Sequence, residues 1–204
     1  MPNVIPTKGN LMARSRSLAL AKLGFELMDR KRNILIREMM GLIDTAAVLQ
    51  EKIDRTFRQA YASLQSANIT LGICGELAEN VPIDDSVQIR YRSVMGVEIP
   101  AVQASGAAPE LSYGFAFTNA SLDDALTCFD RVKRLTCELA EMEISIYRLA
   151  FAVKKTQKRA NALQNIIIPG FTKDIKNITD ALEEKEREEF VRLKVIKRGP
   201  RRQA

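Results

Sequence analysis

Apolar residues recur every seven positions through the amino-terminal third of the chain. Stepping by seven from Leu11 to Ala67, eight of nine positions are apolar, and the exception is Arg32. No proline interrupts this stretch, so the spacing predicts one helix with a coiled-coil seam over residues 11–67. Gly24 and Gly41 each cost such a helix about 1 kcal/mol relative to alanine. A close neighbour and a tolerated surface position explain these two glycines equally well.

A second heptad segment fills the carboxyl-terminal third. It begins at Ser121, whose hydroxyl can cap a helix, with Asp124 in the first turn. Stepping by seven from Val132 to Ile167, with the companion positions three residues further on, ten of eleven positions are apolar and Thr156 is the exception. A period of 3.5 residues held this long implies a left-handed supercoil with a partner helix. The simplest partner is the amino-terminal helix of the same chain, paired antiparallel.

This second pattern is disturbed at Ile168-Pro169-Gly170. Proline removes one backbone donor, so we expect a kink or a change of register near Pro169, with a break into two helices as the alternative. The apolar pattern then resumes at Phe171, Ile175, Ile178 and Leu182. Gly199-Pro200 predicts the end of this helix.

Residues 68–120 have a different character, because half of the ten glycines lie there together with three prolines. Residues 86–92 (SVQIRYR) alternate apolar and polar side chains, and the alternation continues through residues 95–99. This pattern predicts a small β element, such as a hairpin. An apolar patch at residues 111–117 is expected to pack onto the helices.

The fold class expected from these patterns is mainly α. Residues 1–67 form the amino-terminal long helix, residues 68–120 the middle region with a short β-hairpin and loops, and residues 121–204 the carboxyl-terminal long helix, kinked near Pro169 and ending in a basic tail. The two long helices form an antiparallel two-helix coiled coil. Its expected seam comprises Leu18, Phe25, Met28, Leu35, Met39, Leu42, Leu49, Ile53, Val132, Leu135, Leu139, Met142, Ile146, Leu149, Val153 and Leu163.

Composition excludes several kinds of catalytic site. The chain contains no histidine, which removes Ser/His/Asp triads, Cys/His pairs and His-ligated metals. It also lacks a phosphate-binding P-loop, a dinucleotide-binding glycine motif and a calcium-binding EF-hand loop. We therefore expect no catalytic, cofactor-binding or metal-binding residues on this chain. Three cysteines without a CxxC motif, and no signal or membrane-spanning segment, indicate a location in the cytoplasm or peripherally on a cytoplasmic membrane face.

Positive charge gathers at both ends of the chain. Residues 192–204 hold six basic residues and no acidic one, and residues 1–37 hold eight basic and two acidic residues. An antiparallel pair brings both basic regions to one end of the helices, with the β element toward the other. Such an end can bind nucleic acid, anionic lipid or the inside of a protein cavity. A coiled-coil scaffold or a nucleic-acid-associated protein is thus one class that the charge pattern allows.

Nearly the whole chain resembles the D subunits of V-type and A-type rotary ATPases. The resemblance rests on residues 6–11 (PTKGNL) and 19–35 (ALAKLGFELMDRKRNIL) at the amino end. At the carboxyl end it rests on residues 159–163 (RANAL), Ile168-Pro169 and residues 182–194 (LEEKEREEFVRLK). It implies a non-catalytic central-stalk rotor that transmits torque between a catalytic ring of A and B subunits and a membrane ring that moves protons or sodium ions.

The resemblance also implies partners and a location. The A and B subunits surround the shaft, the F subunit binds it, and the C subunit joins it to the membrane ring, with one copy of the shaft per complex. ATP or ADP and magnesium are bound by the partner subunits, so no cofactor, nucleic acid or direct membrane insertion is expected. The complex places the chain in the cytoplasm, peripheral to the membrane. Expected contacts to the A/B ring are Lys8, Arg14, Arg16, Lys194, Lys197 and Arg198.

Overall fold

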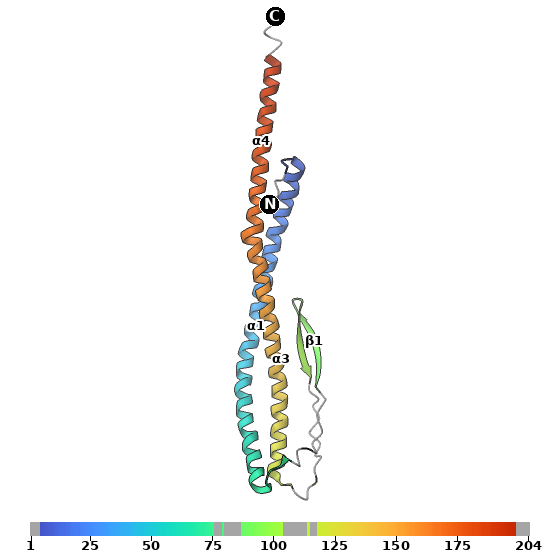
Figure 1. Cartoon of the computed structure of the whole chain (residues 1–204), viewed down its shortest axis with the longest axis vertical. Coiled ribbons are helices and arrows are strands. Elements are labelled where there is room, and N and C mark those ends of the chain that lie inside the picture. The colour runs from blue at the N-terminus through green and yellow to red at the C-terminus, as the bar shows by residue number, and fades with distance from the viewer. Residues whose placement is uncertain (1–4, 76–78, 80–86, 104–113, 115–117, 199–204) are drawn as a thin grey trace. The chain divides into compact units, whose positions relative to one another are not determined.

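A computed structural model describes residues 5–75, 79, 87–103, 114 and 118–198 of the chain. In order, its elements are α1 (Lys8–Leu71), β1 (Gln88–Val94), β2 (Val97–Gln103), α3 (Ala120–Ala162), a π-helical turn (Leu163–Ile167) and α4 (Ile168–Arg198) (Figure 1). The predicted fold class, two long helical segments around a short β element, is confirmed. The predicted apolar patch at residues 111–117 and the predicted stop at residues 199–200 lie outside the described residues, as do the last basic residues of the tail.

The chain divides into two compact units. The terminal unit joins Met1–Arg32 with Lys154–Ala204, and the central unit is Asn33–Val153. Helix α1 contributes to both, and in each unit it pairs antiparallel with the carboxyl-terminal helical segment. In the terminal unit Lys8 meets Glu186, and in the central unit Ala60 packs with Cys128 and Val132.

Helix boundaries follow local capping chemistry. The side-chain oxygen of Asn119 accepts a hydrogen bond from the backbone N–H of Leu122 at 3.1 Å, so α3 is capped by Asn119 and not by Ser121 as the sequence suggested. Helix α1 runs four residues beyond its predicted end, to Leu71. Gly72 follows with φ of +83°, the left-handed conformation that glycine adopts at low cost after a helix.

The seam is built from small clusters of apolar side chains in the central unit. Leu49, Ile53 and Leu135 form one cluster, and Leu35 and Leu149 belong to another. Each residue of the expected seam is buried or half-buried, and small residues between them, such as Ala21 and Ser145, are buried as well. Removal of these side chains from water is the main force that holds the two helices together.

The β-hairpin is tight and packs on the helices through one strand. Strands β1 and β2 are antiparallel, with Val94 opposite Val97, and a two-residue turn joins them. Both turn residues have positive φ, 51° at Met95 and 75° at Gly96, as a type I′ turn requires. Ile99 of β2 is 1% exposed, whereas β1 is exposed along almost its whole length. Strand β2 is therefore the inner strand.

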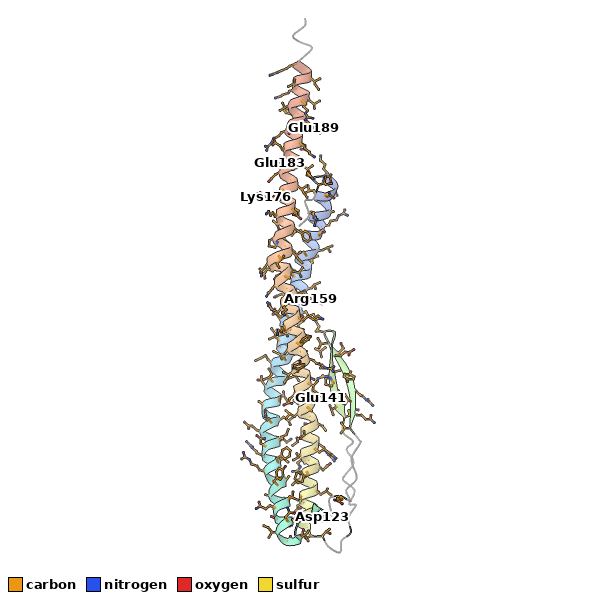
Figure 2. The ribbon with its side chains drawn as sticks, viewed as in Figure 1. Asp123, Glu141, Arg159, Lys176, Glu183 and Glu189 are labelled. Atoms are coloured by element: carbon orange, nitrogen blue, oxygen red, sulfur yellow. The ribbon has the colours of Figure 1, made fainter. Side chains whose placement is uncertain are left out.

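Polar contacts fix the hairpin against α3. The backbone N–H of Val102 donates to a carboxylate oxygen of Glu141 at 2.7 Å, and Figure 2 shows Glu141 on α3 beside the hairpin. Arg148 donates to the carbonyl of Glu98 at 3.0 Å, and its guanidinium lies 5.5 Å from the ring centroid of Tyr91. These contacts hold both strands at a fixed position along α3.

The hairpin lies elsewhere than the sequence suggested. We expected the β element near the end of the helices that is remote from the termini. Instead Ile99 packs with Leu35 and Leu149, near the start of the α1 portion of the central unit. The hairpin therefore folds back along α3, because that is where its single buried isoleucine finds apolar neighbours.

The expected disturbance near Pro169 is a π-helical turn. Its backbone closes with a hydrogen bond from the N–H of Ile168 to the carbonyl of Leu163, one residue wider than an α-helical bond. Because of this extra residue, the apolar positions after the turn come one residue later than the heptad repeat of Leu163 and Ile167 predicts, at Phe171 and Ile178. Ile178 is 3% exposed. The helical segment thus changes its heptad register at this turn while its apolar face stays on α1.

Gly41 offers a test of the helix-propensity cost. A Cβ built at Gly41 meets nothing within 4 Å, so of the two explanations this glycine fits the tolerated surface position. We expect Gly41→Ala to raise the free energy of unfolding by about 1 kcal/mol, as measured by urea denaturation. Gly96→Ala is the matched control, because its φ of +75° strains any alanine and should lower stability. Equal effects from both substitutions would contradict this assignment.

Candidate interaction surfaces on the terminal helices

Helix α4 continues well beyond the start of α1. The Nζ atom of Lys8 lies 3.0 Å from a carboxylate oxygen of Glu186, which sets the first residue of α1 level with Glu186. Helix α4 then runs on to Arg198, about 18 Å further along its axis. Figure 1 shows this segment projecting past the amino-terminal end of α1. We call residues 187–198 the overhang.

The overhang combines apolar and basic side chains without a described helix packed against it. Its large apolar residues are 57–69% exposed, and these are Phe190, Val191, Leu193, Val195 and Ile196. Basic residues alternate with them, and no acidic residue follows Glu189, which Figure 2 labels on this segment. The Nζ atom of Lys194 lies 4.8 Å from the ring centroid of Phe190. Such a mixed surface suits a partner that offers apolar contacts with acidic groups around them.

The six residues expected to contact a partner ring do not form one cluster. Lys194, Lys197 and Arg198 lie on the overhang, beyond the level of Lys8. Lys8 is exposed and ion-paired, and Arg16 is exposed on α1. The basic residues thus extend along the terminal unit instead of meeting at a single point.

Arg14 has a different environment from the other five. Its side chain is 29% exposed and its guanidinium lies 3.9 Å from a carboxylate oxygen of Asp174 on α4. The same guanidinium lies 5.5 Å from the ring centroid of Phe171, within the range of a cation–π contact. Arg14 therefore faces the partner helix, in a long ion pair in which this oxygen of Asp174 accepts no hydrogen bond.

The outer face of α1 carries an apolar stripe that the heptad pattern did not predict. Leu20, Leu23 and Leu27 are spaced for one helix face and are 69%, 56% and 63% exposed. Arg16 and Arg30 continue the same line at either end of the three leucines. The spacing of three and four residues is visible in the sequence. These leucines form a second apolar face on a helix that already has one. A second apolar face of this kind could have been used to predict an exposed stripe from the sequence.

The described part of the chain offers no metal site and no membrane span. No group of three or more Cys, Asp or Glu side chains is placed there to hold a metal ion. None of the described helices is both long and apolar enough to cross a membrane.

The fold and these surfaces define a class: an antiparallel coiled-coil protein with exposed apolar and basic helix faces. Similarity to known proteins narrows the class. Residues 10–198 match the model of the ATP synthase D-subunit family, and the chain belongs to this family.

Relatives from several organisms match along nearly their whole length. The V-type ATP synthase D subunit of Thermotoga neapolitana is 46% identical, over 96% of this chain and 97% of the relative. The A-type ATP synthase D subunit of Thermococcus sibiricus is 35% identical, over 95% and 93%. That of Pyrococcus horikoshii is 35% identical, over 97% and 96%. These matches include both long helical segments and the hairpin between them.

Proposed function

We propose that this chain is the central-stalk rotor of a V/A-type ATPase or ATP synthase. In this role it transmits torque between ATP hydrolysis or synthesis in a ring of A and B subunits and proton or sodium translocation in the membrane ring. Membership of the D-subunit family over residues 10–198 carries the proposal. The paired helices support it, because the apolar clusters of the seam resist separation of the two helices under load.

The proposed role needs no catalytic site on this chain. A rotor couples to its ring when it binds one conformation of the ring better than another, since a ligand shifts an equilibrium only by differential affinity. The terminal unit is chemically asymmetric around its axis, with the leucine stripe of α1 on one helix and Asp174 held by Arg14 on the other. A surface that differs with angle can favour different ring states at successive angles.

The partners follow from the same proposal. The A and B subunits contact the terminal unit, where Lys8, Arg16, Lys194, Lys197 and Arg198 supply exposed positive charge. The F subunit binds the stalk and the C subunit links it to the membrane ring, with one copy of this chain per complex. ATP or ADP and magnesium are held by the partner subunits, and the chain works in the cytoplasm at the membrane periphery.

Neutralising the exposed basic residues tests the contact with the ring. We expect combined replacement of Lys8, Arg16, Lys194, Lys197 and Arg198 by glutamine to lower ion pumping about tenfold, with a smaller loss of ATP turnover, because several complementary contacts disappear together. Arg14 is left unchanged, since its tie to Asp174 belongs to the helix pair. ATP turnover and ion pumping are measured separately in reconstituted complexes.

The control replaces three exposed basic residues of the central unit, Lys52, Arg55 and Arg58, by glutamine. Unchanged turnover and pumping in the five-residue variant would overturn the assigned contact surface. Co-purification tests the proposal as a whole, because a stalk protein should be recovered with the A, B and F subunits in fixed stoichiometry. Recovery with DNA or RNA instead, at an affinity that falls steeply with salt, would favour a nucleic-acid-associated protein.

A further inference from the structure

Arg32 occupies a seam position that the heptad pattern reserves for apolar residues. Its guanidinium donates to the side-chain oxygen of Gln157 at 2.8 Å, across the helix pair. Asp29, one turn earlier on α1, holds a second nitrogen of the same guanidinium at 2.6 Å. Gln157 in turn donates to Asn161 at 2.8 Å. These four side chains form a connected polar layer that joins the two helices of the terminal unit, with Asn161 at its exposed edge.

A second polar contact crosses the same helix pair further along. Arg14 and Asp174 form the half-buried ion pair described above, with Phe171 against the guanidinium. Arg14 lies 18 residues before Arg32 on α1, and Asp174 lies 17 residues after Gln157, so both contacts report the same register. They stand on opposite sides of the π-helical turn at Leu163–Ile167.

Apolar packing alone specifies this register weakly. Seam residues repeat every seven positions, so a slip of one helix by seven residues, about 10 Å, again sets apolar side chains against apolar side chains. The polar contacts do not repeat in this way. A slip in one direction sets Arg14 level with Ala181, and a slip in the other sets it level with Ile167. In the slip that sets Arg14 level with Ala181, Arg32 stands level with Gln164, which can accept its hydrogen bond in place of Gln157. Only the loss of the Arg14–Asp174 contact therefore disfavours this slip.

The π-helical turn makes such a lock useful. Closing the wider turn would shift α4 along α1 by one residue, about 1.5 Å, so the turn is a place where the register of α4 can change. Contacts on both sides of the turn oppose that motion. A buried polar group at one seam position is an established way to fix register in coiled coils, at some cost in stability.

We propose that the Arg32–Gln157 layer and the Arg14–Asp174 pair act together as a register lock, which fixes the axial position along α1 of the carboxyl-terminal helical segment, at the end of α3 before the π-helical turn and in α4 after it. The lock is a property of the chain by itself. It goes beyond the proposed rotor role, and it can hold or fail whether or not that role is correct.

The lock is tested by measuring register and stability separately. Spin labels are placed at two exposed positions, Ser15 on α1 and Lys176 on α4, in full-length chain whose three cysteines are replaced by alanine. Double electron–electron resonance should then give one narrow distance distribution. With leucine at Arg14, Arg32, Gln157 and Asp174, we expect a second population of at least a tenth, displaced by several ångströms up to about 10 Å. The urea midpoint should stay equal or rise.

Two comparisons separate the lock from ordinary stabilisation. Arg14→Gln with Asp174→Asn removes one contact at nearly constant volume and should also broaden the distribution, which keeps the test valid if four leucines prevent folding. Lys8→Gln with Glu186→Gln removes an exposed cross-helix pair, 79% and 63% exposed, and should leave the distribution narrow. A distribution that stays narrow in both lock variants, or a lowered urea midpoint without broadening, would overturn the proposal.

Discussion

Replacing Leu149 by aspartate should lower the free energy of unfolding by about 4 kcal/mol or more. Leu149 is fully buried and packs with Leu35 of α1 and Ile99 of β2. An aspartate there places a charge among apolar side chains without a partner, and this is among the most costly single changes known in proteins. Urea denaturation followed by circular dichroism at 222 nm measures the loss.

The same substitution should also release the hairpin. Ile99 loses its apolar neighbour, so the backbone amides of β2 should exchange with deuterium more than tenfold faster than in the parent protein. Tyr147→Asp is the matched control, because Tyr147 lies on the same helix but is 73% exposed, and its replacement should change stability by less than about 0.5 kcal/mol. Similar losses from the two aspartates would show that Leu149 is not in the core. In the proposed rotor, the Leu149 variant should also uncouple ion pumping from ATP turnover.

The second large effect concerns the π-helical turn. Deleting Gln164 removes the extra residue of the turn, and Pro169→Ala restores the missing backbone donor, so together they should give a continuous α-helix. The apolar face after the turn then stays on α1, because the inserted residue was what had shifted the heptad phase. We expect this combined variant to unfold within about 1 kcal/mol of the parent protein.

A deletion in the regular part of α4 should behave differently. Removing Lys176 rotates every later residue by about 100°, which takes Ile178 and Leu182 off the face that meets α1. The loss of this burial should cost about 2–4 kcal/mol in unfolding free energy. Equal losses of unfolding free energy in the two deletion variants would contradict the idea that the π-helical turn holds one residue in excess of the heptad repeat. Urea denaturation of both variants, with helix content checked by circular dichroism, gives the comparison.

Much of the fold follows from local periodicity. Repeats of seven residues around Leu49 and Leu135 predict two amphipathic helices, and alternation around Ile89 predicts a strand, because these patterns reflect the geometry of one element at a time. Helix ends were harder, since Asn119 and Ser121 both offer a capping oxygen and only the backbone path selects Asn119.

The candidate surfaces were predicted only in part. Charge counting identified both basic termini, but it could not show that Arg14 turns toward Asp174 while Arg16 faces outward. Two residues that are two positions apart on a helix differ in azimuth by about 200°, and the partner helix decides which of them is covered. In the same way, the stripe from Leu20 to Leu27 could be assigned as exposed only after the buried face of α1 was known.

The sequence by itself determined that this chain forms two long helices with complementary seams, a hairpin between them and basic ends, because each feature depends on short-range spacing. Only the tertiary structure decided which residues stand level with one another. It set Arg32 opposite Gln157, placed Ile99 against Leu149 and left the overhang beyond Glu186. The axial register of the two helices depends on contacts between segments that are distant in the sequence. A seam that repeats every seven residues is compatible with several registers, and the few residues that break the repeat select one of them.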